Sequence, residues 1–558
     1  MKIIATLVCC VLFVPTLLMA QAPTQSVDVG AMKSQLAAQQ KTLDQQQKQI
    51  QALQSALDEQ RKMLQSMAAG AENPNAAALQ KSVQDLQNSV SDLKAAEGQA
   101  VSQPLSPEEQ ADLEELQRGP EIADVTPDTP AIALGPAKIR LIGYPALTSV
   151  FRSTNGGGNV GTSFGGIPFS NTAAGNASEF RLSAQSTRLA LRADADLKNS
   201  KVAGYFEMDF GGQVPGNVAV SSTSYGFRIR QAWFDYSTGK FEFTGGQLFS
   251  LMTPSKQGIL PWPGDVATSQ VIDTNYLAGT VWARYPQLRF AYHASKSASF
   301  AFSIENPEQT ACGVTFPSAL ASTLGTQYDN CSSSSGPGLA VPNLTPDFVF
   351  KGSFDTKLGS MPFHLDAAAL LRVFRNYNPT SSTPFNGHNY EVGGGGNMDA
   401  SLQLTPKVRY LIQLYGSSGG GRYIGGLLPD VVVQSNGSIT PIPAYSWTIG
   451  FEFAPSKVTG FYVYYSGNYG ERETVLDTTV TPHKLVGWGF PGASNGADRY
   501  IQEATGGWAR VIWKGENLGS VQTGFQYAYV WLSPWSAGNG PSQAHTNMVF
   551  WQTRYNLP

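Results

Sequence analysis

Apart from its first residues, the sequence has no apolar run long enough for a membrane-spanning helix. Such a helix needs about 20 consecutive apolar residues, and only residues 3–19 come near that length. This run follows Met1 and Lys2 and ends at Ala20, a pattern typical of a secretory signal peptide. We therefore expect residues 1–20 to be removed during export; a single anchoring helix is the alternative.

Cysteine and histidine are scarce, which leaves little material for a metal site. Of the four cysteines, Cys9 and Cys10 leave with the signal peptide, and Cys312 and Cys331 remain in the exported chain. Because thiols oxidise outside the cytosol, we predict a Cys312–Cys331 disulfide, with two free thiols as the alternative. The five histidines are scattered, without the spacing of metal ligands. We expect no metal and no cofactor.

Motifs for catalysis are present only without their structural context. Residues 416–420 match G-x-S-x-G around Ser418, and residues 156–161 match G-x-G-x-x-G. Both lie in glycine-rich segments with no helix pattern after them, whereas a nucleophile elbow or a phosphate cradle needs a strand, a tight turn and a helix. We expect no enzymatic activity and no nucleic-acid partner.

The near-neutral net charge of −3 conceals two parts of opposite sign. Residues 1–136 contain 9 Lys and Arg against 16 Asp and Glu, which gives −7. Residues 137–558 contain 29 against 25, which gives +4. The charge thus separates an acidic N-terminal segment from a mildly basic remainder.

The acidic segment has the pattern of a helical stalk. Apolar residues recur every seven positions at Leu36, Leu43, Ile50, Leu57 and Leu64. This is a diluted coiled-coil repeat, and so narrow a stripe needs partner helices. We interpret residues 21–118 as a periplasmic coiled-coil segment that self-associates and contacts peptidoglycan; a lone, partly disordered arm is the alternative. Residues 119–136 contain four prolines and are interpreted as an extended linker.

Residues 137–558 show the period-two alternation of two-faced β-strands. In the final strand, for example, Val549 and Trp551 oppose Phe550 and Gln552. Short connections alternate with long ones rich in Gly, Ser, Asn and Pro, and an even strand count with this alternation describes an outer-membrane barrel.

We predict an all-β fold, a 16-stranded antiparallel transmembrane β-barrel in a Gram-negative outer membrane, preceded by the periplasmic stalk. Residues 277–294 leave the count open. Two strands turning at Pro286 would give seventeen, whereas one strand with a bulge there gives sixteen, and we choose the second. Such a bulge would also place Arg284 and Arg289 on one face.

Basic side chains are assigned to the inner face of the barrel. An arginine on the lipid face at mid-membrane costs about 2–4 kcal/mol, so basic residues opposite apolar ones should face the bore. The predicted channel-lining residues are Arg188, Arg192, Arg228, Arg230, Arg284, Arg289, Lys351, Arg372, Arg409, Arg510 and Arg554. Acidic residues on these faces are fewer, which predicts a positive field favouring anions. For any single arginine, a bond to a loop or neighbouring strand is the alternative.

One long connection, residues 250–275, is predicted to narrow the bore. It carries few charges and contains Pro254, Pro261, Trp262 and Pro263. A rigid, partly apolar loop of this kind can fold inward as a constriction; an outward surface loop is the alternative.

Three segments of the strand-rich part stand out: Arg228-Ile229-Arg230-Gln231-Ala232, Gly246-Gln247-Leu248-Phe249-Ser250 and Arg284-Tyr285-Pro286-Gln287-Leu288-Arg289-Phe290. Their arrangement resembles the DcaP-like family of outer-membrane porins. The resemblance implies a signal peptide, a periplasmic coiled coil and a trimeric sixteen-stranded barrel that admits small anions such as dicarboxylates. It also implies that Arg228, Arg230, Arg284 and Arg289 lie along the channel. The cysteine pair and the non-aromatic C-terminus, Leu557-Pro558, depart from the pattern.

Together these features predict a homotrimeric porin that sits in outer-membrane lipid and passes small anionic solutes by diffusion. A sugar-selective channel is one alternative, since Trp262, Trp508 and Tyr415 could stack on sugar rings. A structural or adhesive protein with a closed barrel, anchored to the cell wall by its stalk, is another.

Overall fold

The computed structural model describes residues 130–156, 159–212, 225–261, 268, 270–329, 343–379, 387–425, 428–493, 496–538 and 540–558. The predicted signal peptide, stalk and most of the linker lie outside the described residues, as do Trp262, Pro263 and Cys331. The chain divides into two units, residues 1–104 and 105–558, and all described residues belong to the second. Among them, no helix has the length and apolar character needed to cross a membrane.

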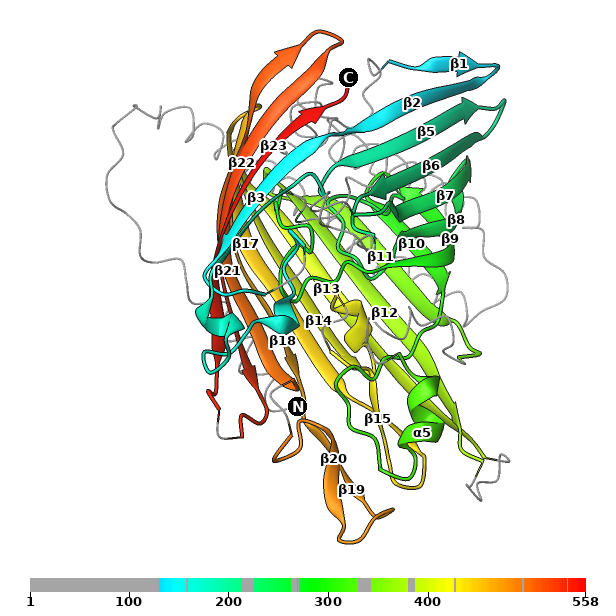
Figure 1. Cartoon of the computed structure of the whole chain (residues 1–558). Coiled ribbons are helices and arrows are strands. Elements are labelled where there is room, and N and C mark those ends of the chain that lie inside the picture. The colour runs from blue at the N-terminus through cyan, green and yellow to red at the C-terminus, as the bar shows by residue number, and fades with distance from the viewer. Residues whose placement is uncertain are drawn as a thin grey trace, which may run out of the picture. The chain divides into compact units, whose positions relative to one another are not determined.

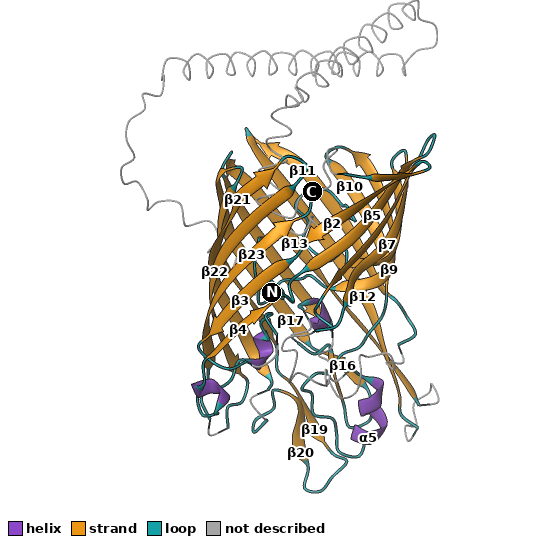
Figure 2. Ribbon diagram, turned by 45° about the horizontal axis from the view of Figure 1, so that its top comes forward, coloured by secondary structure: helices purple, strands orange, loops and turns teal. Residues whose placement is uncertain are grey.

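A 19-stranded antiparallel sheet forms the wall of a barrel (Figures 1 and 2). Its strands are β1 (Ile132–Leu134), β2 (Ala137–Tyr144), β3 (Ala146–Arg152), β4 (Glu179–Ser183), β5 (Arg188–Asp196), β6 (Lys201–Asp209), β7 (Arg228–Thr238), β8 (Phe241–Phe249), β9 (Arg284–Ser295), β10 (Ala298–Glu305), β11 (Asp347–Leu358), β12 (Met361–Tyr377), β13 (His388–Thr405), β14 (Val408–Ser418), β17 (Pro443–Ser456), β18 (Thr459–Gly470), β21 (Asp498–Gly515), β22 (Gly519–Pro534) and β23 (Ala544–Asn556).

Short elements occupy the long connections. Two hairpins are β15 (Val431–Val433) with β16 (Ile439–Pro441), and β19 (Glu473–Asp477) with β20 (Lys484–Trp488). The helical turns are η1 (Phe164–Gly166), η2 (Ala174–Asn176), α5 (Ala321–Leu324), η4 (Gly325–Gln327) and η5 (Gly421–Tyr423). The β19–β20 hairpin and α5 lie at the end of the barrel that is lowest in Figure 1.

Strands that follow one another in sequence are neighbours in the sheet. The pairings run from β2 to β5 and onward to β23. At its far side β23 pairs with β3, with Phe550 opposite Val150. Only Pro145 separates β2 from β3, and its carbonyl accepts a hydrogen bond from the Tyr555 amide at 3.1 Å. The β2–β3 segment therefore contacts both the second stretch of wall and the last strand.

The predicted alternation of strand faces is present in the structure. In β22, Gln526, Ala528 and Val530 are fully buried, whereas Tyr527 on the opposite face is 42% exposed. Large apolar side chains recur on the exposed faces of the other strands, as at Phe234 and Val463. An apolar outer belt of this extent is what hydrocarbon, and not water, accommodates.

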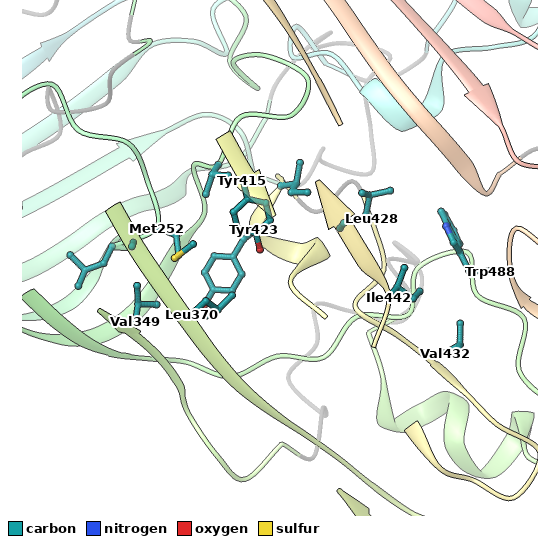
Figure 3. Packing of buried hydrophobic residues seen from close by; sticks show 14 of the residues in the cluster. Met252, Val349, Leu370, Tyr415, Tyr423, Leu428, Val432, Ile442 and Trp488 are labelled. Atoms are coloured by element: carbon teal, nitrogen blue, oxygen red, sulfur yellow. The ribbon is translucent and has the colours of Figure 1, made fainter. Parts of the chain in front are cut away.

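The core of the barrel is built largely from connections that fold inward. Met252 and Tyr423 come from different long connections, and both are fully buried in one apolar cluster with wall residues such as Leu370 (Figure 3). A second cluster joins Val160 and Phe164 of the 153–178 connection to wall residues of β21–β23. The bore is thus narrowed from several sides by the chain itself.

Two predicted boundaries are wrong. The end of the predicted linker forms β1, which turns at Gly135 (φ +59°) and pairs with β2. Residues 277–283 precede β9 rather than belonging to it, because this stretch is drawn into the interior, where Leu277 is 1% exposed. The pairing of β8 with β9 runs continuously through Pro286, so the predicted bulge is wrong.

Candidate channel lining

Acidic residues of β6 and basic residues of β5 and β7 meet inside the barrel. The Arg230 guanidinium lies 2.6 Å from the Glu207 carboxylate and 3.0 Å from that of Asp209. Arg228 binds Asp209 at 2.7 Å, and Arg188 lies 3.8 Å from Glu207. The three arginines share the carboxylates of Glu207 and Asp209, so these side chains form one ion-pair network.

A β-bulge brings Arg230 into this group. In the β6–β7 pairing, Glu207 opposes Gln231 and Met208 opposes Ile229, so Arg230 is the extra residue. A bulge redirects the side chains that follow it. Both Arg230 and Gln231 are consequently buried, at 1% and 0% exposure. Strict alternation would have separated them, and the sequence carries no signal for the bulge.

Arg284 adds a further positive charge at the start of β9. Its guanidinium lies 5.2 Å from the Trp282 ring centroid and 5.6 Å from that of Phe249, and it interacts electrostatically with Arg230, Arg228 and Glu207. We call the following set the arginine cluster: Arg188, Arg228, Arg230, Arg284, Glu207 and Asp209. Its guanidinium groups outnumber its carboxylates by two.

Arg284 and Arg289 do not share a face, contrary to the prediction. Without a bulge at Pro286, the buried members of β9 are Gln287, Arg289 and Ala291. The Arg289 guanidinium donates to the Phe249 carbonyl oxygen at 2.6 Å. The two arginines therefore occupy different surroundings, and only Arg284 lies with the arginine cluster.

The inward basic residues Lys351 of β11 and Arg409 of β14 are buried in ion pairs. Lys351 Nζ lies 2.8 Å from Asp366 and donates to the Thr253 carbonyl oxygen at 2.9 Å. Arg409 lies 2.5 Å from Glu452. All four charged side chains are at most 8% exposed, because in-folded connections and neighbouring side chains cover them.

Two arginines clamp one of these connections to the wall. Arg372 of β12 lies 3.0 Å from Asp347 and 2.9 Å from Asp430. Arg422 of η5 lies 3.0 Å from the same Asp347 oxygen, and the Tyr423 hydroxyl donates to it at 3.0 Å. We call these five residues the arginine clamp. Sequence reasoning missed Arg422, because it lies in a connection where strand alternation gives no information.

Residues 250–261, the described start of the connection after β8, contact inward-facing residues of the wall. The Ser255 amide and hydroxyl donate to Asp366 at 2.9 and 2.8 Å, and Asn397 donates to the Met252 carbonyl oxygen at 2.5 Å. Both wall residues belong to inward faces, on β12 and β13. These residues can lie inside the barrel because they carry few charges and because carboxylates of the wall accept hydrogen bonds from their backbone amides.

A small pocket lies beside this connection. Pro254 and Pro261 line it together with Arg289 and Lys351. The structure thus brings two of the predicted constriction residues together with two of the predicted lining residues.

Arg510 is not an inward residue, contrary to the prediction. It is exposed and lies on the same face of β21 as Trp508, which packs against Trp551 on the outer surface with ring centroids 5.7 Å apart. Arg510 lies only five residues before the end of β21, where a long side chain reaches the interfacial region and avoids the cost of mid-membrane burial.

The expected shortage of inward acidic residues is also wrong. Arg192 lies 2.8 Å from Asp194, and Arg140, which the sequence analysis missed, lies 2.9 Å from the same carboxylate. Arg554 donates to the Gln522 side chain at 2.6 Å. Inward guanidinium groups are therefore paired with carboxylates or side-chain amides. The positive electrostatic field inside the barrel is consequently weaker than the number of arginines suggests.

Cys312 is disulfide-bonded, while the predicted partner Cys331 lies outside the described residues. The pairing of these two cysteines stays a prediction.

The fold has counterparts among solved structures. The outer-membrane channel DcaP of Acinetobacter baumannii is 15% identical, matches 76% of this chain and 99% of that chain, and superposes with a TM-score of 0.53. The chain has the fold of the DcaP-type porins. Porins OprB of Pseudomonas putida (10% identical, 75% and 94% covered, TM-score 0.42) and OmpF of Salmonella typhi (7% identical, 77% and 100% covered, TM-score 0.41) are more distant. No protein-family model and no curated protein matches the sequence.

Proposed function

We propose that this protein is a porin through which small solutes diffuse passively across the outer membrane, with a preference for anions such as small dicarboxylates. The observation that carries the preference is the arginine cluster, with its surplus of two positive charges. Within it, the Arg228 side chain remains 38% exposed. A partly exposed guanidinium can meet a solute carboxylate, which a fully buried one cannot.

The wall we propose is a closed barrel of sixteen strands. In this interpretation β2 with β3 is one strand interrupted at Pro145, and β4 with β5 is another interrupted at residues 184–187. Proline interrupts a ladder because it has no amide proton to donate. The pairing of β23 with β3 supports closure. A homotrimer is proposed from the resemblance to DcaP-type porins.

Weak binding is the expected consequence of the paired guanidinium groups. A solute carboxylate that approaches Arg228 competes with Asp209, which already accepts two hydrogen bonds from it at 2.7 and 3.0 Å. The net gain on binding is therefore small. Weak, repeated contacts are what a conducting site requires, since a solute held tightly would not leave.

A channel for neutral sugars is a second candidate, favoured by the extent of ion pairing inside the barrel. An inward aromatic pair, Tyr205 and Trp233, is stacked with ring centroids 5.3 Å apart, but both side chains are buried, at 6% and 5% exposure. Two aromatic residues that were expected to stack on sugar rings are not placed to do so. Trp508 lies on the outer surface, and Tyr415 is only 5% exposed. The positions of these aromatic residues therefore favour small anions over sugars as the solutes.

The proposed function is tested by replacing Arg228 with glutamine. One unit charge about 8 Å from a passing ion in a mostly aqueous bore is worth about 0.5–1 kcal/mol. Because the charge attracts anions and repels cations by the same energy, the R228Q variant should show an anion-to-cation permeability ratio about five- to thirtyfold lower, read from reversal potentials in planar bilayers. Arg230 is less suitable, because its burial makes the barrel depend on it for stability.

The matched control is R510Q. It removes the same charge from the outer surface, so selectivity should stay at that of the parent protein. Equal effects of R228Q and R510Q, or none from either, would refute the anion preference. Purified protein without any conductance would refute the channel itself.

A further inference from the structure

We propose that the acidic segment just before the barrel, residues 105–129, docks on lysines at the short-turn end of the barrel wall. The partner surface consists of nine side chains, which we call the lysine rim: Lys138, Lys198, Lys201, Lys240, Lys296, Lys357, Lys407, Lys457 and Lys514. The inference goes beyond the proposed function, because it concerns the end of the barrel and does not depend on conduction.

The first observation is where the lysines of the barrel lie. Residues 130–558 contain twelve lysines, and the nine of the lysine rim all lie in a short turn of the wall or within two residues of one. All nine are exposed. Of the other three, Lys256 and Lys351 are buried, and Lys484 is exposed in the β19–β20 hairpin at the opposite end of the barrel (Figure 1). Exposed lysine therefore marks one end of the wall.

Few exposed carboxylates accompany these lysines. Within two residues of the short turns that the structure describes, the exposed acidic residues are Asp196, which lies 3.8 Å from Lys201, and Glu516. Glu242 is also near a turn, but it is 9% exposed and lies 3.1 Å from His293. Nine lysines against two exposed carboxylates leave a surplus of seven positive charges. A lysine ammonium is a compact, strongly hydrated charge, so this surface is suited to an acidic partner that arrives through water.

The second observation is the distribution of charge before the barrel. Residues 1–104 contain eight Lys and Arg against eight Asp and Glu, so they carry no net charge. Residues 105–129 contain eight Asp and Glu against one basic residue, Arg118, so the whole −7 of the N-terminal part lies there. Segments dense in one charge commonly bind surfaces of the other sign. The segment and the lysine rim carry charges of equal size and opposite sign.

The chain itself brings the segment to the lysine rim. In the β1–β2 pairing, Ala133 lies opposite Lys138, so the chain enters the wall beside a member of the rim. Asp128 comes only four residues before Ile132, the first residue of β1. A short tether of this kind gives the two partners an effective concentration of about a millimolar. Ion pairs that are weak one by one are then sufficient to hold the segment.

The segment is long enough to reach several turns. Glu108 comes 24 residues before Ile132, which corresponds to at most about 80 Å of extended chain. Adjacent strands lie about 4.8 Å apart, so successive short turns are about 10 Å apart along the rim. Turns on either side of β2 are therefore within reach. The headgroup of an anionic phospholipid is the competing occupant, but it lacks the covalent tether and the matched number of charges.

Zero-length carbodiimide coupling of the full chain tests the docking, because this reagent joins a carboxylate only to an amine in contact with it. The purified protein in non-ionic detergent is coupled at low salt and at about 1 M salt, where the Debye length falls to about 3 Å, and joined peptides are identified by mass. We expect links from residues 108–128 to Lys240 and Lys296, at least about fivefold fewer at high salt. Lys138 is not scored, because it lies too near along the chain. The matched control is the exposed Lys484, which should form no link.

A second readout is the rate of trypsin cleavage after Arg118, the one basic residue of the segment. The K240Q/K296Q/K357Q variant should raise this rate at least about threefold, because a released segment is cleaved more often, and K484Q should leave it unchanged.

The docking would be overturned by an absence of links to Lys240 and Lys296, by equally frequent links to Lys484, or by the same links at both salt concentrations. Equal cleavage rates in K240Q/K296Q/K357Q and K484Q would also overturn it. Missing links together with a co-purified anionic phospholipid that K240Q/K296Q/K357Q loses would assign the lysine rim to lipid headgroups instead.

Discussion

The two sides of the barrel contain similar ion pairs in different surroundings. On the side of β2, β5 and β7, the Arg192–Asp194 pair remains 21% and 28% exposed. On the side of β11, β12 and β14, the Arg372–Asp347 pair is fully buried. Buried pairs lose hydration and depend on one another, whereas exposed pairs contribute little. The same residue types therefore fix connections on one side and stay in contact with solvent on the other.

The largest effect expected from this comparison is that of D347N. Asp347 accepts from Tyr423 and pairs with Arg372 and Arg422, so removing its charge leaves two buried guanidinium groups short of a partner. Breaking a buried pair in this way costs about 3–5 kcal/mol. Denaturant unfolding in detergent, followed by tryptophan fluorescence, measures the loss. A cost under about 1 kcal/mol would show that the arginine clamp does not hold the connection.

A smaller effect is expected from G393A in β13. An added methyl group would lie 2.6 Å from a ring carbon of Phe374 and 2.8 Å from the Ser418 carbonyl oxygen. Overpacking of this kind costs about 1–3 kcal/mol. The run of glycines at residues 393–396 thus permits close approach of the neighbouring wall strands β12 and β14.

The matched variant on the other side is G204A in β6, where nothing lies within 4 Å of the added methyl group. Its stability in the same assay should stay within about 0.5 kcal/mol of the parent protein. Equal losses at the two glycines would remove the packing contrast between the two sides.

The smallest effect is expected from D194N. Its carboxylate serves Arg140 and Arg192 at 2.9 and 2.8 Å, but all three side chains keep contact with solvent. The expected loss is below about 1 kcal/mol, and it should shrink as salt is raised from 0.1 to about 1 M, since screening shortens to about 3 Å. Unfolding at both salt concentrations measures it. A loss as large as that of D347N, or one insensitive to salt, would mean that this pair is buried as well.

Much of the fold was predictable because strand alternation is a local property. Leu191 faces outward and Arg192 inward for a reason visible in adjacent residues, the cost of a charge in hydrocarbon. Arg510 shows the limit of this reasoning, since near a strand end an arginine can face outward and still reach the interface.

Three features of the site required the folded chain. The bulge at Arg230 arises from pairing with β6, a strand some twenty residues away. The arginine clamp joins Asp347, Arg372 and Arg422 from separate parts of the sequence. The abundance of inward acids became apparent only when connections such as the one carrying Asp430 proved to fold inside.

The sequence by itself determined the lipid-facing and inward faces of most strands, because alternation along a strand and the cost of burying charge act over neighbouring residues. Only the tertiary structure decided which inward charges remain open to solvent. That outcome depends on where connections from distant parts of the chain pack inside the barrel. No local sequence pattern shows which wall carboxylates a loop will bind.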